Sequence, residues 1–491
     1  MGIIQKIALD SDCGKITFLL DALDECQSSE QQNLITKLKW LEQKMQVRHG
    51  SAKNFKFFVT SRPYWNIEKG FHDLIRNIPG IRLERENQSE GLRSEIDRVI
   101  EARVSRLGHQ IASNRARKNL LQGLLEIENR TYLWLHLIFD FIALKPRIDT
   151  NLVESLLQYL PTSVETAYDA ILQKSSDRER AKRLLHIVVA AVRPLSVNEV
   201  GVALYITEET RTYEDLELQG SRQLEITIRD LCGLFVSIVE KKVLLIHQTA
   251  KEFLIAQNDF SSSTSPSCGT WKRSLSIRDS NFILASICVW FLRLEEFHRK
   301  SSSLTPGKID ELVSRYDFFK YSAMNWAVHF RTAMIPEGHS IIALGLELCD
   351  VQAGRYMSWQ LVYWERDMYD SLPAGRTNLQ LASLLGLESV VGQLFAAPGI
   401  DVNAADNKGC TPPLSWAVRN EHEAVVSQLL AAPDINVNVA DNMGQTPLWK
   451  AVYNGNGAVV SQLLAAAGIN VNAADNVGQL RRAQYRHQRG R

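Results

Sequence analysis

The sequence predicts a multi-domain α/β plus α chain: an amino-terminal α/β segment, then helical domains, then a carboxyl-terminal helical solenoid. Three observations favour this fold class. The chain has 491 residues, enough for about three domains, with 45% hydrophobic and 23% charged residues, as in globular proteins. Two short apolar runs near the amino terminus flank a helix-like stretch, which indicates an α/β sheet. A 34-residue repeat near the carboxyl terminus indicates stacked helix pairs.

The charge balance argues against several function classes. Lys and Arg total 56 against 55 Asp and Glu, so no basic excess marks the chain for nucleic acid or an acidic membrane surface. Apolar stretches fall short of the ~20 residues that cross a bilayer, and no secretory or transit sequence is apparent at the amino terminus. The seven cysteines form neither a disulfide framework nor a zinc pattern. We therefore expect a cytoplasmic protein that binds neither membrane nor nucleic acid.

Charged residues follow both amino-terminal apolar runs. The first run, residues 16–20, reads as a buried strand and is followed by three carboxylates, Asp21, Asp24 and Glu25. The second run, residues 55–60, is followed by Arg62. Open α/β sheets bind ligands at the carboxyl ends of their strands. The pattern therefore predicts a ligand site at this edge.

These two segments resemble known motifs. FLLDALDEC (residues 18–26) and FFVTSRP (57–63) resemble the Walker B strand and the sensor strand of NACHT-type STAND NTPases. The resemblance implies that Asp21 holds Mg²⁺, that Asp24 and Glu25 orient the attacking water, and that Arg62 meets the γ-phosphate of ATP. Phosphoryl transfer needs these three contributions. The alternative is structural: the acids cap a helix, and Asp21 pairs with Arg62.

The phosphate-binding loop of such an enzyme is missing from the sequence. No GxxxxGK[ST] motif occurs, and fifteen residues precede the first strand. The segment thus resembles the carboxyl half of a NACHT domain, and we expect neither tight ATP binding nor hydrolysis by this polypeptide. The alternative is an active ATP-dependent switch, with ADP or ATP and Mg²⁺ bound by a longer form that contains the loop.

The middle of the chain reads as helices followed by a small hairpin. Apolar residues recur at helical spacing through residues 92–160, and Ser196 with Glu199 forms a capping box that opens a further helix. Strands 236–239 and 243–246 are expected to pair across residues 240–242. Helices followed by such a wing describe a winged-helix domain. The helix at 196–205 has no arginine, so DNA-groove recognition is not expected.

The segments RPLSVNEVGVAL (193–204) and LLIHQTAKEFLI (244–255) resemble the winged helix attached to NACHT NTPases. The resemblance implies that His247 contacts a nucleotide phosphate and holds the resting state closed. A packed histidine with no ligand is the alternative. A Ser-rich stretch then predicts a linker. The aromatic-rich helices that follow are similar to the connector between the NACHT and ankyrin parts of fungal proteins.

The carboxyl-terminal repeat is explicit. Residues 424–432 and 458–466 both read AVVSQLLAA, and residues 402–407 and 471–476 both read VNAADN. Thr446 can cap a helix that begins at Pro447, and Gly455 can end it. These residues resemble the ankyrin repeat, with two full copies and one degenerate copy. The resemblance implies protein partners bound on the repeat surface.

The predicted domains follow from these assignments. They are the carboxyl part of a NACHT fold (1–90), a helical subdomain (91–160), a winged helix (161–258), a Ser-rich linker (259–280), a helical connector (281–370), ankyrin repeats (371–479) and a basic tail (480–491). We expect a protein-interaction and signalling protein of the fungal NACHT and ankyrin type, with an inactive NTPase segment. Self-association stays open.

Overall fold

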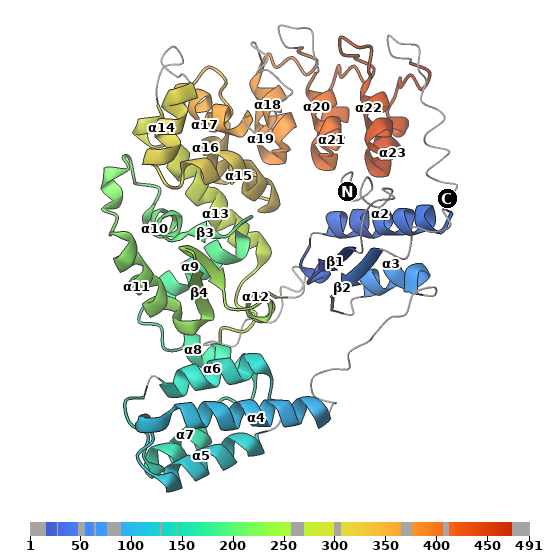
Figure 1. The fold of residues 1–491 in the computed structure, drawn as a ribbon. Helices are drawn as coiled ribbons and strands as arrows, with labels where there is room; N and C mark the ends of the chain where they lie inside the picture. The colour runs from blue at the N-terminus through green and yellow to red at the C-terminus, as the bar shows by residue number, and fades with distance from the viewer. Residues whose placement is uncertain are drawn as a thin grey trace. The chain divides into compact units, whose positions relative to one another are not determined.

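The chain divides into two compact units, Met1–Ser94 and Glu95–Arg491. The computed structural model describes residues 16–26, 28–47, 55–62, 65–75, 90–127, 130–143, 145–256, 270–298, 306–364, 376–405 and 412–473. Figure 1 shows the elements of each unit. The predicted Ser-rich stretch (260–268) and the basic tail lie outside the described residues.

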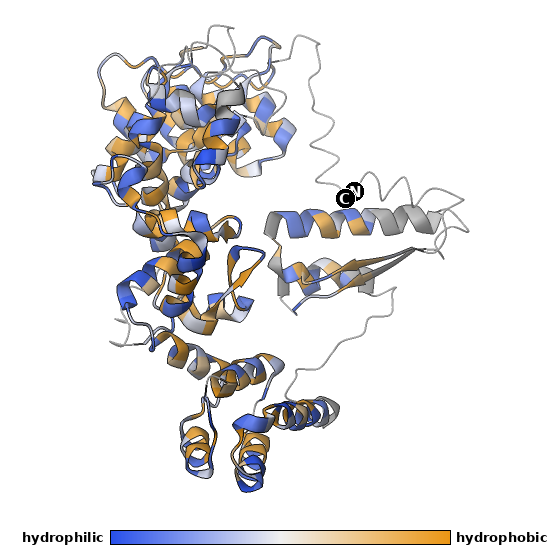
Figure 2. Cartoon of the chain, turned by 60° about the vertical axis from the view of Figure 1, so that its left-hand side comes forward, coloured by the Kyte–Doolittle hydropathy of each residue, from blue (hydrophilic) through white to orange (hydrophobic). Residues whose placement is uncertain are grey.

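The amino-terminal unit contains a parallel pair of strands and two helices. Strand β1 (Ile16–Leu20) pairs in parallel with β2 (Phe55–Val59), so that Leu20 lies opposite Val59. Both strands are mostly hydrophobic in Figure 2. The helices are α2 (Ser28–Val47) and α3 (Trp65–Ile75), and a 3₁₀ turn, η1 (Leu23–Glu25), follows β1. The two predicted strands are confirmed, while a larger P-loop sheet stays a prediction.

A small apolar core holds this unit together. Leu23 from η1, Ile35 from α2 and Ile67 from α3 pack against one another and are at most 4% exposed. The side chain of Val59 packs against this cluster from β2. Each element beside the strand ends is therefore anchored by at least one apolar side chain. This packing fixes the loops that follow β1 and β2.

The second unit is helical apart from one three-stranded sheet. None of the described helices is both long and apolar enough to span a bilayer. The helices are α4 (Glu90–Arg106), α5 (Asn114–Glu126), α6 (Tyr132–Ala143), α7 (Thr150–Tyr159), α8 (Val164–Leu172), α9 (Arg178–Ala190), α10 (Val197–Tyr205), α11 (Ser221–Cys232), α12 (Gln248–Leu254), α13 (Ile277–Leu292), α14 (Pro306–Arg315), α15 (Phe319–Thr332), α16 (Ser340–Leu348), α17 (Gly354–Trp364), α18 (Asn378–Leu385), α19 (Glu388–Phe395), α20 (Pro413–Arg419), α21 (Glu423–Leu430), α22 (Pro447–Asn454) and α23 (Gly457–Ala465).

The sheet has the order β3-β5-β4 and is antiparallel, with β3 at Leu195–Ser196, β4 at Val236–Val239 and β5 at Lys242–Leu245. The prediction of a three-residue turn was wrong by one residue. Only Glu240 and Lys241 join β4 to β5, and both have positive φ, 49° and 61°. A two-residue turn of this kind matches the right-handed twist of the strands, so β5 begins one residue earlier than expected.

The predicted capping box at α10 is confirmed. The Ser196 hydroxyl accepts from the Glu199 N–H at 3.1 Å, and the Glu199 carboxylate accepts from the Ser196 N–H at 2.7 Å. Arg193 adds a salt bridge to Glu199 at 2.6 Å. Glu199 is 5% exposed, so this acid serves the fold of α10 and does not face solvent. The cap fixes where β3 ends and α10 begins.

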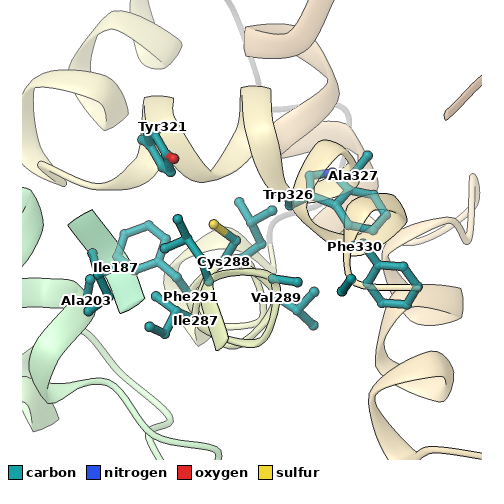
Figure 3. Packing of buried hydrophobic residues seen from close by; sticks show 14 of the residues in the cluster. Ile187, Ala203, Ile287, Cys288, Val289, Phe291, Tyr321, Trp326, Ala327 and Phe330 are labelled. Atoms are coloured by element: carbon teal, nitrogen blue, oxygen red, sulfur yellow. The ribbon is translucent and has the colours of Figure 1, made fainter. Parts of the chain in front are cut away.

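One hydrophobic core runs through the second unit. It extends from Leu137 in α6 to Leu463 in α23 without a break between clusters. Figure 3 shows its centre, where α13 lies between side chains of α9 and α10 on one side and α15 on the other. Phe291 and Cys288 of α13 and Trp326 of α15 are fully buried there. The predicted aromatic connector is thus the central packing element of this unit.

A chain of hydrogen bonds runs through this centre. The Val192 N–H donates to the Tyr321 hydroxyl at 3.1 Å, and that hydroxyl is 2.8 Å from Nε2 of His329. Nδ1 of His329 lies 2.8 Å from Oδ1 of Asn281, whose amide nitrogen donates to the carbonyl of Ile277. Since Oδ1 can only accept, Nδ1 carries a proton. Burial lowers the pKa of His329 to about 4, so the ring is neutral near pH 7 and its Nε2 accepts from Tyr321.

The repeat array comprises the three helix pairs α18–α19, α20–α21 and α22–α23, which stack side by side (Figure 1). Thr446 caps α22 through a bond from the Trp449 N–H at 3.2 Å, Pro447 begins the helix, and Gly455 ends it with φ 77°. These predictions are confirmed. Successive repeats are joined by asparagine side chains: Asn403 donates to the Asp434 carbonyl, and Asn438 to the Gly468 carbonyl.

Three histidines, two of them buried and one half-buried, make the stability of the second unit depend on pH. Burial lowers the pKa of His186, His329 and His422 to about 4. In the unfolded chain a histidine has a pKa near 6.5, so between pH 6.5 and 4 the unfolded state takes up protons that the folded state refuses. Stability is therefore constant above that window and falls by about 1.4 kcal/mol per pH unit for each histidine within it.

Thermal unfolding of the full chain between pH 7.5 and 5 measures this slope. The His329→Gln variant should lose about a third of the slope, because one of the three groups is gone. A matched control, His109→Gln, changes an exposed histidine in the same unit and should keep the wild-type slope. Equal slopes for His329→Gln and the wild type would mean that His329 is not held neutral.

Candidate functional site

The carboxyl ends of β1 and β2 bring the predicted acidic and basic residues to one edge. Asp21 follows β1 directly and is exposed, whereas Arg62 lies two residues beyond the start of the β2 loop at Thr60. The pairing of Leu20 with Val59 sets the two loops side by side. The predicted convergence of Asp21, Asp24 and Arg62 at this edge is therefore present in the structure. The side chain of Glu25 lies outside the described set.

Asp24 and Arg62 form a tight pair. The Arg62 backbone N–H donates to Oδ1 of Asp24 at 3.0 Å, and Nε of Arg62 lies 3.5 Å from Oδ2. The Asp24 side chain is 6% exposed, while that of Arg62 is 33% exposed. A buried carboxylate needs such partners, because burial without them is costly. Arg62 thus pairs with Asp24, whereas the structural alternative had paired it with Asp21.

Asp21 makes a different contact. The Thr60 hydroxyl donates to Oδ1 of Asp21, and no other partner of the Asp21 side chain is present among the described residues. The next residue, Ala22, has the left-handed conformation with φ 53° and ψ 51°. Alanine adopts this region at a cost of roughly 1–2 kcal/mol. Strained backbone of this kind clusters at functional sites.

The donor set at this edge fits Mg²⁺ only together with a phosphate ligand. Mg²⁺ is usually bound by one or two carboxylates, with water and substrate phosphates completing its octahedron. Asp21 offers an exposed carboxylate of this type. No group of three or more acidic, histidine or cysteine side chains converges anywhere in the described residues, so a cage made only of such side chains is absent there. Asp21 is the residue that could hold the cation.

His247 lies in the second unit, at the start of α12. Its Nδ1 accepts from the Thr249 N–H at 3.2 Å and lies 2.9 Å from the Thr249 hydroxyl, which also contacts the Tyr168 hydroxyl at 3.0 Å. His247 is exposed. Because Nδ1 accepts, the proton of the neutral ring is on Nε2. The side chain is a helix cap and also presents a ring N–H to solvent.

The last α-helix before the hairpin of β4 and β5 is α11. Sequence reasoning considered α10 as the groove-reading helix, but α10 is largely buried. The α11 helix carries Arg222 and Arg229 together with Glu225 and Asp230, and Arg229 pairs with Glu225 at 3.9 Å. The charges balance, so this helix has no basic excess for a phosphate backbone.

The array presents side chains that differ between repeats at equivalent positions. Leu384, Arg419 and Tyr453 occupy one such position, and Gln380, Ser415 and Trp449 another. Tyr453 is 59% exposed and its ring stacks on Trp449 with centroids 5.2 Å apart. The second-helix sequence AVVSQLLAA is identical in two repeats. At the positions that differ, Gln380 and Ser415 are fully buried, whereas Tyr453 is exposed, so only the last described repeat presents a large aromatic side chain there.

Three family models match the chain. Residues 2–62 match the amino-terminal domain of nephrocystin 3, residues 168–264 match the winged helix domain of GPI inositol-deacylase, and residues 368–475 match ankyrin repeats in three copies. By these matches the chain combines an amino-terminal segment similar to the nephrocystin 3 domain with a winged helix and ankyrin repeats. All the predicted strand-edge residues fall within the first match, and His247 falls within the second.

The chain is also similar to a curated protein, the vegetative incompatibility protein HET-E-1 of Podospora anserina. The two are 25% identical over 400 residues. The alignment covers 78% of this chain and 28% of that protein. The chain thus spans little more than a quarter of the length of its relative.

Sequence reasoning missed two features of these sites. It identified Thr60 only as the end of a strand, although the hydroxyl of Thr60 contacts Asp21. It also gave no role to the stacked Trp449 and Tyr453. The stacked pair could have been found in the sequence, because both positions vary between repeats whose second-helix sequence is constant. The contact between Thr60 and Asp21 could be found only from the register of β1 and β2.

Proposed function

We propose that this chain is a protein-interaction and signalling protein that binds its partners through the ankyrin array. Ankyrin repeats imply protein–protein interaction. The observation that carries the proposal is the stacked aromatic pair of α22, in which Tyr453 is 59% exposed and Trp449 is half-buried. Tryptophan, tyrosine and arginine dominate binding energy in protein interfaces. Arg419 stands at the position of Tyr453 in the preceding repeat.

The contacts that hold α22 in the array do not explain why the aromatic ring of Tyr453 is exposed. Ala451 and Leu448 of the same helix are buried, at 0% and 9% exposed, and they make the contacts that hold α22 in the array. Tyr453 of the same helix is 59% exposed, so it does not belong to these buried contacts. A large exposed aromatic side chain at a repeat position that varies is the pattern of a specificity residue.

A double variant tests the proposal. The full chain is immobilised, proteins are captured from an extract of the source organism, and partners are identified by mass spectrometry. Trp449→Ala with Tyr453→Ala should lose specific partners, and the affinity of a purified partner should fall by at least about 30-fold, as expected for truncation of a 2 kcal/mol hot spot. Leu464→Ala, which changes another exposed apolar residue of the last repeat, is the matched control. Equal affinities for all three chains would contradict the proposal.

A second function is an ATP-dependent switch. In it Asp21 holds Mg²⁺, Asp24 and Glu25 orient the attacking water, Arg62 meets the γ-phosphate, and His247 donates Nε2–H to a nucleotide phosphate. The match to the nephrocystin 3 domain and the position of Asp21 at the sheet edge support this proposal. The pairing of Arg62 with Asp24 means that a phosphate must compete with that carboxylate for the guanidinium.

ATP turnover distinguishes the two functions. We expect no turnover by this chain above that of Asp21→Ala, because the sequence contains no GxxxxGK[ST] loop to bind the phosphates. Turnover that disappears in Asp21→Ala would establish the switch instead. A form extended upstream of Met1, assayed in parallel, shows whether such a loop completes the site.

A further inference from the structure

Thr60 directs all of its polar groups to the end of β1. Its backbone N–H donates to the Leu20 carbonyl at 2.9 Å, and its carbonyl accepts from the Leu23 N–H at 3.0 Å. Its hydroxyl accepts from the Ala22 N–H at 2.9 Å and donates to Oδ1 of Asp21. One residue of the β2 loop therefore contacts each of the four residues from Leu20 to Leu23.

The direction of the hydroxyl bond follows from a count of donors and acceptors. A threonine hydroxyl has one proton and two lone pairs. The Ala22 N–H uses a lone pair, and the carboxylate of Asp21 can only accept. The proton of Thr60 is therefore directed at Asp21. The torsion that rotates a carboxylate is otherwise broad, so this bond selects one orientation of Asp21 and leaves Oδ2 free of described partners.

The same hydroxyl supports the strained turn. Ala22 is left-handed, which alanine adopts at a cost, and the Thr60 hydroxyl satisfies its N–H. This turn directs the chain from β1 into η1, where Leu23 enters the small core. The backbone and the side chain of Asp21 are thus fixed by one neighbour.

Asp24 provides the contrast within the same loop. Its carboxylate is 6% exposed and bonded to the backbone and side chain of Arg62. The Asp21 side chain is exposed and bonded only to a neutral hydroxyl among the described residues. Of these two carboxylates, Asp21 is the one that a cation can reach without breaking an ion pair.

We propose that Thr60 is the positioning residue for cation binding by Asp21. The inference rests on the proposed role of Asp21 as the Mg²⁺ ligand. Thr60 holds one carboxylate oxygen and turns the other toward the cation. Partners that orient a metal ligand in this way commonly alter metal affinity by about 10- to 100-fold when they are removed.

Iron-directed cleavage of the full chain tests the inference. Fe²⁺ with ascorbate and hydrogen peroxide cuts the backbone close to a bound iron, and the cut sites are read by mass spectrometry. In the presence of ADP, whose phosphates complete the coordination of the cation, the wild type should be cut near residues 20–26 and 59–62, and Mg²⁺ should suppress the cuts. Thr60→Ser keeps the hydroxyl and should behave as the wild type. Thr60→Val keeps the shape and should need at least about tenfold more Fe²⁺.

Asp21→Ala separates the two claims. If the wild type shows no cut that depends on Asp21, the cation role fails and the Thr60 inference fails with it. If the Asp21-dependent cut persists equally in Thr60→Val, Asp21 binds a cation but Thr60 does not position it. Hydrogen exchange of β1 is measured for each variant. Loss of β1 protection in Thr60→Val, or loss of the cut in Thr60→Ser, would also overturn the positioning role.

Discussion

The packing of α13 against α15 is the contact on which most of the second unit depends. Winged-helix side chains approach α13 from one side, and the helices that lead to the repeats pack beyond α15. The hydrogen bond between His329 of α15 and Asn281 of α13 crosses the same contact, and Tyr321 of α15 bonds the other ring nitrogen of His329. Apolar burial supplies the stability, whereas directional bonds to buried polar groups favour one alignment. A shift of α15 along α13 would break the bond between His329 and Asn281 and leave both buried groups unpaired.

The first repeat of the ankyrin array packs against the helices of the connector. Arrays of about three repeats are marginal alone, because each repeat buries its apolar face only against the next. Here α16 packs on α19, and the Arg331 side chain donates to the Leu385 carbonyl at the end of α18 at 2.6 Å. Arg376 is 5% exposed and lies against the rings of Trp364 and Trp416, which join α17 to α20. The connector thus serves as an end cap for the array.

Local sequence signals predicted the element ends well. The Ser196 cap, Pro447 at a helix start and left-handed Gly455 each depend on residues within one turn, so the chemistry of a short window decides them. The contacts of the strand edge are different. Thr60 with Asp21 and Arg62 with Asp24 join residues 38 or 39 positions apart, and the strand register decides which charges meet. The sequence showed the charges, but the structural alternative paired Arg62 with Asp21, whereas its partner is Asp24. The sequence also did not show that the connector shares one core with its neighbours. The spacing of its aromatic residues predicts that they are buried, but not which residues they contact.

Hydrogen exchange of the full chain in mild denaturant tests the shared core most directly. The account predicts that α9, α13, α15 and α18 open together, with one free energy and one denaturant dependence, because a single core holds them. Opening of α18 and α19 at much lower denaturant, with α13 and α15 still protected, would contradict it and would show that the array is an independent unit.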